Sequence, residues 1–327
     1  MISGKGGTGK TSLVASFAAL AGNAVLADCD VDAADLHLVL APTIRRREEF
    51  WCGHVAAIRQ ADCTGCGICL ARCRFGAVRR VNGDRNITVP DTVRTSCDRC
   101  DDGCVRSCPV KSADLLEAIR ETCGQQDDPS FAIDPTACEG CGVCAWLCPV
   151  KAIDLPERLG GEWYVSDTRH GPMVHARLLP GGENSGKLVS KVREAARILA
   201  GERKTDLILV DGPPGVGCAV IASIGGASLV LVVTEPTLSG AHDMARVLEL
   251  TQHFGIPTAV CVNKWDLNEE MTERIESDAR KSGATIAGRI RYDRAVTAAQ
   301  MQGRAVVETD TGPLVQDIRT VWETLSR

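Results

Sequence analysis

Twelve of the 17 cysteines stand in three groups of four, all between residues 63 and 148. Along the chain the groups are Cys63, Cys66, Cys69 and Cys73; Cys97, Cys100, Cys104 and Cys108; and Cys138, Cys141, Cys144 and Cys148. A reducing cytosol does not maintain a framework of disulfides, so cysteines this dense in such a compartment indicate metal binding. These thiolates are the first candidates for chemistry in the chain.

The first and third groups share the spacing C-x2-C-x2-C-x3-C. Three closely spaced thiolates on a tight loop cap three corners of an iron–sulfur cubane, and the fourth Cys of each run binds the other cluster, as in bacterial ferredoxins. Glycines beside the cysteines would let backbone N–H groups face the sulfides. Zinc is the alternative, although it favours paired C-x2-C units. The spacing therefore predicts two [4Fe–4S] clusters, one on Cys63, Cys66, Cys69 and Cys148 and one on Cys138, Cys141, Cys144 and Cys73.

The middle group has a different spacing, C-x2-C-x3-C-x3-C, and resembles runs in electron-transfer subunits of the polyferredoxin type. It could hold a third cluster, bind zinc or hold no metal, and a third cluster is the hypothesis to test. Counts of iron and sulfide separate these cases, because about eight of each per chain excludes a third cubane.

A second set of residues, at the N-terminus, has the spacing of a phosphate-binding loop. Residues 4–11, GKGGTGKT, match G-x-x-x-x-G-K-[ST]. Glycines let the backbone curl until successive N–H groups point at phosphate, and the helix that follows adds its positive end. Lys10 is expected to reach the β- and γ-phosphates, and the Thr11 hydroxyl to bind Mg²⁺. The predicted nucleotide contacts are Gly4, Gly6, Gly7, Thr8, Gly9, Lys10, Thr11 and Ser12.

Acidic residues follow two of the predicted strands. Asp211 ends the apolar run 206–211 and precedes a rigid Gly-Pro-Pro-Gly turn that closes with Gly215. It fits the role of holding Mg²⁺ directly or through water. Asp28 and Asp30 close the strand predicted at 24–28, and ligands of open α/β sheets bind at the carboxyl ends of strands.

The sequence SGKGGTGKT at residues 3–11 resembles the deviant Walker A loop of the class that contains MinD, ParA and the nitrogenase iron protein. The resemblance implies that Lys5 crosses a dimer interface to the γ-phosphate of the partner subunit, so that the chain forms a homodimer across Mg-ATP. It also implies that Asp30 belongs to switch I and orients the attacking water, which makes Lys5, Lys10 and Asp30 the catalytic candidates. Gly215 takes the γ-phosphate-sensing position of switch II.

Two later segments resemble the base-binding loops of the same class. In VNKWD, residues 262–266, Asn263 would read adenine, which favours ATP over GTP. IRYD, residues 290–293, resembles a loop that is usually I-P-x-D, with Arg291 in place of Pro. Cys218 follows Asp211 by seven residues, close to the offset at which the nitrogenase iron protein has a cluster ligand. No matching second Cys lies upstream, so we expect Cys218 to be a buried small residue.

These sites need a scaffold, and short apolar runs supply it at residues 24–28, 206–211, 229–234, 258–262 and 284–290. Their near-continuous apolar character predicts a parallel sheet buried on both faces. Helices are expected over 10–21, over 187–200 with Gly201 as its end, over 112–122, and from the N-cap Asn268 to Gly283. The predicted fold class is α/β, a MinD-like P-loop NTPase of residues 1–42 and 166–327, with an inserted α+β ferredoxin-like domain at 43–165.

The start of the chain conflicts with this scaffold. A phosphate loop should follow a central strand, and Met1 and Ile2 cannot supply one. The hypothesis is that the native chain carries several more apolar residues upstream, which mass spectrometry of the native N-terminus would test.

Composition excludes several classes of partner. The net charge is −5 and aromatic residues make up 4% of the chain, so neither electrostatic attraction to nucleic acid nor base stacking is expected. The run Arg45 to Arg47 reads as a solvated face. No apolar stretch approaches the ~18 residues that cross a bilayer, and no signal peptide precedes the first motif, so we expect a cytoplasmic protein without membrane insertion.

Taken together, the chain resembles the MinD-superfamily ATPases that contain an inserted ferredoxin domain. The resemblance implies an ATPase that gates electron transfer through [4Fe–4S] clusters to a redox partner. The alternative is a carrier that delivers clusters to apo-proteins, as the Mrp type does, although the C-x-x-C that carriers hold late in the ATPase domain is missing. A positioning ATPase of the septum-site type would need a C-terminal membrane helix, and the tail 313–327 reads instead as a docking helix.

Overall fold

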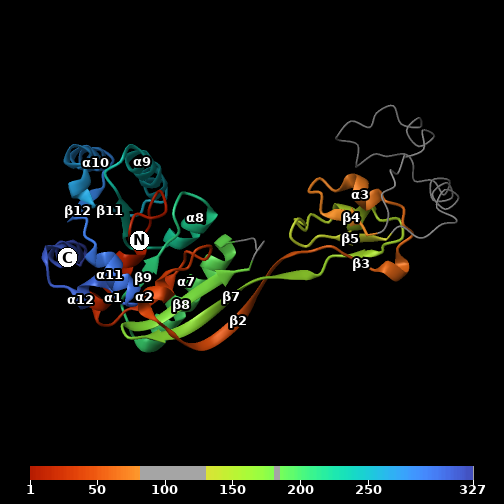
Figure 1. The fold of residues 1–327 in the computed structure, drawn as a ribbon, viewed down its shortest axis with the longest axis horizontal. Helices are drawn as coiled ribbons and strands as arrows, with labels where there is room; N and C mark the ends of the chain where they lie inside the picture. The colour runs from red at the N-terminus through yellow and green to blue at the C-terminus, as the bar shows by residue number, and fades with distance from the viewer. Residues whose placement is uncertain (82–129, 180–184, 327) are drawn as a thin grey trace. The chain divides into compact units, whose positions relative to one another are not determined.

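A computed structural model describes residues 1–81, 130–179 and 185–326 (Figure 1). The chain divides into two compact units, which we call the core unit, Met1–Phe50 with Leu159–Arg327, and the cysteine unit, Trp51–Arg158. The chain passes between them within two strands, β2 (Thr43–His54) and β7 (Glu157–Thr168). The boundaries predicted from the sequence, 42/43 and 165/166, lie at the start of β2 and near the end of β7.

The core unit is an α/β fold with a mostly parallel sheet, as predicted. Five strands run in the order β2-β7-β8-β1-β9, in which β1 pairs in parallel with β8 and β9, and β7 is antiparallel to β8. Three more strands, β10-β11-β12, are parallel to one another. The bounds are Val25–Asp28 for β1, Gly171–Leu178 for β8, Ile208–Asp211 for β9, Val230–Thr234 for β10, Thr258–Asn263 for β11 and Thr285–Ile290 for β12.

The first three residues connect these two groups of strands. Ile2 forms an isolated parallel bridge with Val232, and Ser3 forms one with Pro214. The amide of Ile2 donates to Leu231 at 3.0 Å, and the amide of Gly212 donates to Met1 at 2.8 Å. Short bridges thus stand where the sequence analysis expects a central strand. Beside them lies a cavity of about 790 Å³, lined on its two sides by residues 206–210 and 227–231.

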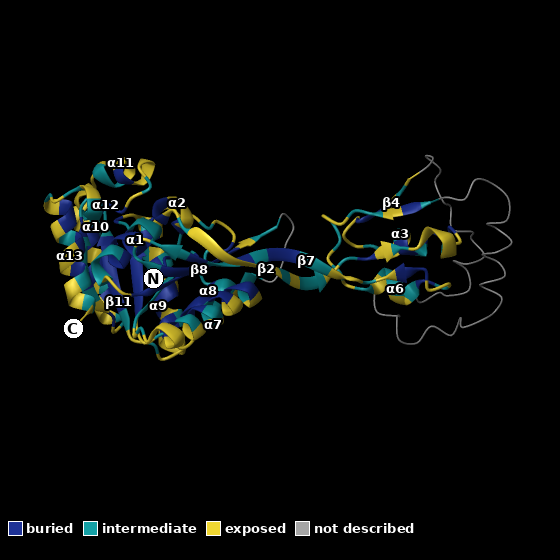
Figure 2. Ribbon diagram, turned by 90° about the horizontal axis from the view of Figure 1, so that it is seen from below, coloured by how far each residue is buried: buried dark blue, intermediate teal, exposed yellow. Residues whose placement is uncertain are grey.

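Side chains of the strands alternate between two helical layers. On β10, Val230 and Val232 pack with the layer that contains α9 (Leu238–His253) and α10 (Glu269–Lys281), whereas Leu231 and Val233 pack with α1 (Lys10–Ala21) and α13 (Pro313–Leu325). On β1, Val25 and Ala27 face α7 (Ser185–Arg203), and Leu26 packs against α1 and α2 (Leu36–Leu40). Figure 2 shows β8 and β11 as buried and much of β2 as exposed. Burial on both faces gives the strands their apolar sequences, at about 1.5–3 kcal/mol for each large side chain.

The helices predicted in the core unit are present, with one correction to a boundary, and further helices were not predicted. Gly201 does not end α7, which continues to Arg203. The φ of Gly201 is not positive, and beyond its own helix no atom of the described residues lies within 4 Å of the place where its Cβ would stand, so this residue fits the interior of a helix. The Asn268 side chain caps α10 by accepting from the amide of Met271, as expected. The helix predicted at 112–122 lies outside the described residues. The helices are α1 Lys10–Ala21, α2 Leu36–Leu40, α7 Ser185–Arg203, α8 Cys218–Ile224, α9 Leu238–His253, η3 Trp265–Leu267, α10 Glu269–Lys281, α11 Ala295–Met301, α12 Val306–Thr309 and α13 Pro313–Leu325.

The described part of the cysteine unit consists of two similar halves. Each half has a strand, a cysteine loop, a five-residue helix and a second strand, and α3 and α6 occupy positions 75 residues apart (143 − 68). The halves interlock, because β3 pairs with β6 and β4 pairs with β5, both antiparallel. The elements are β3 Ala57–Ile58, η1 Gln60–Asp62, α3 Ile68–Arg72, β4 Val78–Arg80, β5 Phe131–Ile133, α6 Val143–Leu147 and β6 Ile153–Asp154.

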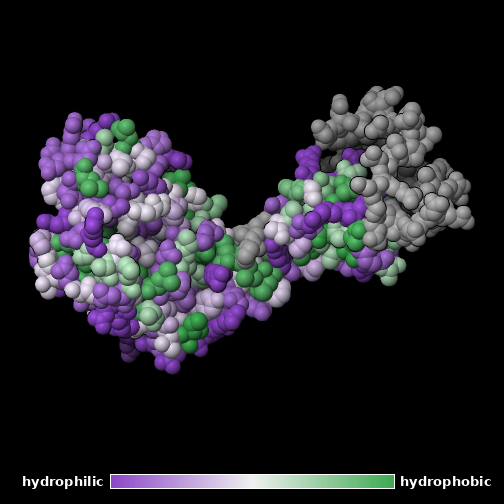
Figure 3. All heavy atoms as spheres, viewed as in Figure 1, coloured by the Kyte–Doolittle hydropathy of each residue, from purple (hydrophilic) through white to green (hydrophobic). Residues whose placement is uncertain are grey.

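The surface of the core unit seen in Figure 3 is mainly hydrophilic, with apolar residues in small separate patches. The three arginines at 45–47 are about two-thirds exposed and pair with Asp167, Glu48 and Glu162, which confirms a solvated face. Among the described residues, no helix has the length and apolar character that a membrane span requires.

Candidate functional site

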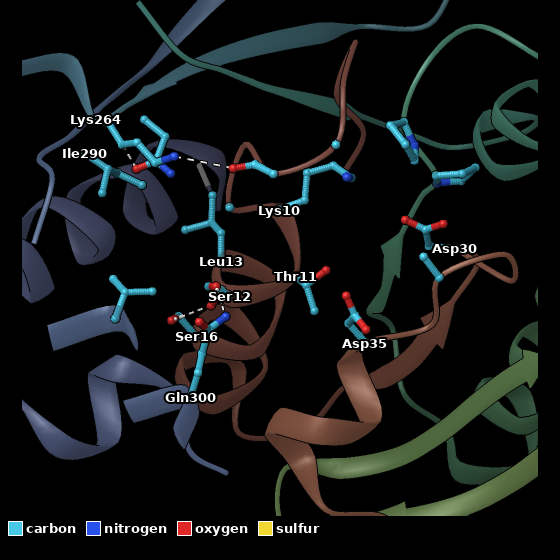
Figure 4. A pocket seen from close by; sticks show the side chains of 18 of the residues that line it. Lys10, Thr11, Ser12, Leu13, Ser16, Asp30, Asp35, Lys264, Ile290 and Gln300 are labelled. Carbon is cyan, nitrogen blue, oxygen red and sulfur yellow. Dashed lines mark hydrogen bonds between the residues drawn. The ribbon is translucent and has the colours of Figure 1, made fainter. Parts of the chain in front are cut away.

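The carboxyl ends of the parallel strands surround a pocket of about 780 Å³. One side is formed by the phosphate loop and the start of α1, and Figure 4 shows Lys10 and Thr11 there, with Asp30 and Asp35 beyond Thr11. Ile290 and Gln300 line the other side. The pocket includes eight of the predicted site residues, namely Gly6, Gly7, Gly9, Lys10, Thr11, Ser12, Asp30 and Asn263. Gly4, Lys5, Thr8, Asp211 and Gly215 lie outside its lining.

Residues packed against the phosphate loop leave no room for a side chain at two of its glycines. Gly9 has a φ of 87°, and a Cβ there would stand 2.5 Å from Nδ2 of Asn263. A Cβ on Gly4 would stand 2.2 Å from the Cβ of Asp243 in α9. Side chains are thus excluded where the loop meets β11 and α9, and the loop is held in a curled form before any ligand binds.

A hydroxyl and two carboxylates form the candidate magnesium site. Thr11 Oγ1 donates to Oδ2 of Asp211 at 2.7 Å, and the register of β1 and β9 pairs Asp28 with Asp211. Both carboxylates are buried, and among the residues that the structure describes, Oδ1 of Asp211 and Oδ2 of Asp28 have no hydrogen-bond partner. Burial raises the pKa of both carboxyl groups, and the charge of Asp211 raises that of Asp28 further. Oxygen ligands with unmet charge fit a hard cation such as Mg²⁺, which would relieve this repulsion.

Asp30 stands at the edge of the same group. Burial raises its pKa to about 6, against the opposing charge of Lys10, and Asp211 adds to the rise. Its amide donates to Oδ1 of Asp28 at 3.2 Å. The predicted role of Asp30, to orient the attacking water, stays a prediction.

At the far end of the pocket, Asn263 is already engaged within the protein. Its Nδ2 donates to the carbonyl of Thr8 at 2.8 Å, and its Oδ1 accepts from the amide of Lys264 at 3.0 Å. Because the amide has a second N–H and its oxygen a second lone pair, these two bonds leave room for the adenine contact, which stays a prediction. The interaction ties β11 to the phosphate loop.

Two contributors to this end were not predicted. Gln300 donates to Oγ of Ser12 at 2.7 Å. Arg291 uses the N–H that a proline lacks, donating to Oδ2 of Asp317 at 3.2 Å, and its guanidinium bonds the same carboxylate at 2.6 and 3.0 Å. The departure from I-P-x-D thus fixes the loop to α13, which no local sequence signal indicates.

Lys5 does not point into the pocket of its own subunit. Its Nζ lies 3.0 Å from Oε1 of Glu235 and donates to Oγ of Ser239 at 3.3 Å. Gly215 has a φ of 95°, and its amide donates to the carbonyl of Ser3 at 2.8 Å. The predicted roles of both residues need a ligand or a partner subunit and stay predictions.

Cys218 contradicts its expected burial. It is exposed, begins α8 and lines the pocket, because α8 starts directly after the turn that follows β9. The sequence indicated its position shortly after Asp211, but not its exposure.

In the cysteine unit, the predicted ligand sets are brought together in two cavities. One is lined by Cys63, Cys66, Cys69 and Cys148. The other is lined by Cys73, Cys138, Cys141 and Cys144. In each set three thiols come from one loop and the fourth from the other half of the unit. Within the described chain, no three His, Cys, Asp or Glu side chains converge on a point for one metal ion, whereas a cubane takes each thiolate at a different iron.

Backbone amides are directed at several sulfurs. Ala152 donates to Sγ of Cys148 at 3.2 Å, and Ala56 donates to Sγ of Cys138 at 3.5 Å. Burial alone would raise the pKa of Cys73, but hydrogen bonds from the amides of residues 75–78 lower it below the usual value. Amides that favour a thiolate form fit an iron–sulfur cluster, whose sulfurs are commonly hydrogen-bonded in this way.

Glycines complete these loops. Gly65, Gly67, Gly140 and Gly142 all have φ between 62° and 76°. A Cβ on Gly140 would stand 2.3 Å from the carbonyl oxygen of His54. The residues present thus fit two cubanes. The middle group, Cys97, Cys100, Cys104 and Cys108, lies outside the described residues.

Comparisons with known proteins agree with this geometry. Residues 1–306 match the family model of the CobQ/CobB/MinD/ParA nucleotide binding domain. An uncharacterized protein of Methanocaldococcus jannaschii is 30% identical over 271 residues, 82% of this chain and 78% of that protein. A ferredoxin of Hydrogenibacillus schlegelii, described as 7Fe, is 32% identical over 62 residues, 18% of this chain and 80% of its own. The septum site-determining protein MinD from Pyrococcus horikoshii, complexed with Mg-ADP, shares the fold at 15% identity, with a TM-score of 0.51 and coverage of 100% of this chain and 94% of that one.

Proposed function

The chain belongs to the family of CobQ/CobB/MinD/ParA nucleotide-binding domains, and from that premise we propose that it is a homodimeric Mg-ATPase whose nucleotide state gates electron transfer through [4Fe–4S] clusters. Residues 63–81 and 130–148 supply the cluster ligands of an inserted ferredoxin-like domain. The redox partner is a separate protein.

One observation carries the proposal. Each of two cavities in the cysteine unit is lined by three thiols of one loop and one thiol of the other half, the crossed arrangement that the spacing predicts. Zinc sites built from paired C-x2-C units do not require such an exchange of ligands between halves. Cubanes held there would supply one-electron carriers.

The core unit supplies the nucleotide side of the proposal. Lys10 and the amides of the loop would bind the phosphates, and Thr11 and Asp211 would hold Mg²⁺. Asp30 would orient the attacking water and accept its proton. Asp30 and the turn after β9 both border the pocket, so loss of the γ-phosphate can move segments on either side of Thr11.

Anaerobic purification of the full chain tests the proposal. We expect a brown protein with about eight iron and eight sulfide per chain, or about twelve of each if the middle group also binds a cubane. Mg-ATP should shift the cluster reduction potential, whereas ADP should shift it less. A colourless, iron-free preparation, or one without affinity for Mg-ATP, would refute the proposal.

The same preparation tests the carrier alternative. After incubation with an apo-ferredoxin, a gated electron-transfer protein keeps its iron, with and without ATP. Ready transfer of clusters to the acceptor would favour delivery over electron transfer.

A further inference from the structure

Lys5, the lysine expected to act on a partner subunit, is held inside its own subunit by an ion-pair triad. Its Nζ lies 3.0 Å from Oε1 of Glu235, and Nζ of Lys264 lies 3.1 Å from Oε2 of the same carboxylate. The Glu235 side chain is 15% exposed, against 33% for Lys5 and 27% for Lys264. One partly buried carboxylate therefore binds a lysine of the phosphate loop and a lysine that follows β11.

The position of Glu235 is fixed by its surroundings. It follows the last residue of β10, and Thr237 caps α9 by accepting from the amide of Gly240 at 3.0 Å. A Cβ on Gly240 would stand 2.3 Å from the carbonyl oxygen of Glu235, so the turn is packed against the helix start. The carboxylate is thus presented by a rigid turn.

The two lysines are not equivalent. Lys264 also approaches the carbonyl of Gly7, with Nζ at 3.4 Å, and its amide is bound by Asn263, so it belongs to the fixed frame of the site. Within the described chain, the polar contacts of Lys5 are those with the partly exposed Glu235 and the exposed Ser239, made at the end of a flexible stem. If Lys5 leaves, Lys264 still neutralises Glu235, and no buried charge is left unpaired.

We propose that Glu235 is a positioning residue that retains Lys5 within its own subunit, and that pairing of two nucleotide-bound subunits requires Lys5 to exchange Glu235 for the partner's nucleotide. The inference rests on the proposed function, since it needs a homodimer across ATP. The inference adds to that function the contact that opposes pairing of the two subunits. Lys264 lowers the free-energy cost of this exchange, because it stays beside Glu235 as the counter-charge.

Three variants of the full chain test this, with dimerisation measured by sedimentation in a non-hydrolysable ATP analogue and Mg²⁺. Glu235→Gln removes the charge that holds Lys5, so the dimer should form at a protein concentration about fivefold lower or more, because two triads open in each dimer. Lys264→Met leaves Lys5 as the sole counter-charge, so the dimer should require a higher concentration. Lys5→Ala should stay monomeric.

The two substitutions should change the concentration needed for dimerisation in opposite directions, which distinguishes a positioning role of Glu235 from general damage to the fold. A carboxylate with a purely structural role would weaken pairing in both Glu235→Gln and Lys264→Met. Affinity for Mg-ADP, which lacks the γ-phosphate, serves as a check on folding and should be unchanged in Glu235→Gln. Pairing by Glu235→Gln that is equal to or weaker than wild type, with normal ADP affinity, overturns the inference. A wild-type protein that binds the analogue yet stays monomeric overturns the proposed homodimer, and the inference with it.

Discussion

Buried charge is the common feature of the residues at the phosphate end of the pocket. Asp28 and Asp211 face each other across β1 and β9, and within the described residues one oxygen of each has no hydrogen-bond partner. Burying two such carboxylates opposes folding and favours a bound cation, so stability and ligand binding oppose each other at this position. The two carboxylates and Thr11 thus fit the Mg²⁺ site that we propose.

Replacing one carboxylate should separate stability from binding. In Asp211→Asn the repulsion and part of the burial penalty disappear, so we expect the ligand-free melting temperature to rise, by about 2–4 °C for each kcal/mol gained. The affinity for Mg-ATP should fall at least about tenfold, since a charged ligand of the metal is lost. Thermal melting with and without Mg-ATP measures both. Asp206→Asn, ahead of β9 at its opposite end, is the matched control, and a lower melting temperature for Asp211→Asn alone would contradict the argument.

A buried histidine beside these carboxylates should set part of the acid stability. His175 is the register partner of Asp28, bonds Ser166 at 2.9 Å and stacks near His37 and Tyr164. Burial, assisted by His37, lowers its pKa from 6.5 to about 4. The unfolded chain therefore binds more protons between these values, and the free energy of unfolding should decrease as pH falls from about 6.5 to 4, by about 3 kcal/mol.

Denaturant unfolding of His175→Gln tests that assignment. The variant keeps a hydrogen-bonding partner for Ser166 but cannot titrate, so its stability should change less over the same pH range than that of the wild type. The difference between the two proteins removes the opposite contribution of Asp28 and Asp211, whose raised pKa values stabilise the fold toward lower pH. Parallel pH curves for the two proteins would show that His175 is not responsible.

At the scale of elements, the parallel strands β1, β9, β10, β11 and β12 could be predicted to within about two residues because burial on both faces makes them continuously apolar. Three strands of the described core unit were missed. The strand β8, which is also parallel to β1, was missed because Pro172, His175 and Arg177 interrupt its apolar run. β2 is largely exposed and carries a charged run, and β7 contains two glycines, so neither has a strand's usual signal. The triad of Lys5, Glu235 and Lys264 joins residues more than 200 positions apart, and no local pattern encodes it. The crossed cysteine sets, in contrast, were expected because their spacing matches that of bacterial ferredoxins.

The loop of residues 291–293 is bound to α13 through Asp317, and the importance of this attachment for nucleotide binding can be tested. Asp317→Asn weakens the bonds to Arg291 and frees residues 291–293, so we expect nucleotide affinity to fall about two- to fivefold, as for a partly exposed ion pair. Isothermal titration measures the change. Arg319→Gln on the exposed side of the same helix should leave affinity unaltered, and equal losses in both variants would point to α13 as a whole.

The interlocked halves of the cysteine unit predict which variants behave alike. Cys73→Ser and Cys141→Ser should impair the same cluster, although the residues are 68 positions apart (141 − 73), because both thiols line one cavity. Cys148→Ser should impair the other cluster, together with Cys66→Ser. Electron paramagnetic resonance of the reduced proteins distinguishes the two signals. Identical spectra for Cys141→Ser and Cys148→Ser, which share a loop but not a cavity, would refute the crossed arrangement.

For the whole molecule, the first residues of the given sequence join the two groups of strands in the core unit. Within the described part of the chain, Ile2 and Ser3 bridge the two groups, and the α-amino group of Met1 is buried and donates to the carbonyl of Val210 at 2.5 Å. Burial, partly offset by Asp211, lowers the pKa of that amino group from 8.0 to about 6. In a recombinant protein that starts at Met1, the unfolded state therefore binds more protons between pH 6 and 8, so stability should rise by about 3 kcal/mol as the pH increases across this interval.

A chain extended ahead of Met1 tests this junction. An apolar, strand-forming extension such as Val-Ile-Val replaces the ammonium by an amide and enters the adjacent cavity, so it should raise the melting temperature and flatten the pH dependence between 6 and 8. A Gly-Ser-Gly extension should flatten the dependence without raising the melting temperature. A pH dependence that survives both extensions would assign it to other groups.

The buried position of Met1 also decides where a label can be attached. A tag or fluorophore fused directly in front of Met1 would begin beside the bridges that Ile2 and Ser3 make to Val232 and Pro214. Ser326 is exposed but lines the same cavity as Met1, so a label there also lies beside this junction. A dye placed there would report whether a ligand at the phosphate loop tightens the two groups of strands against each other.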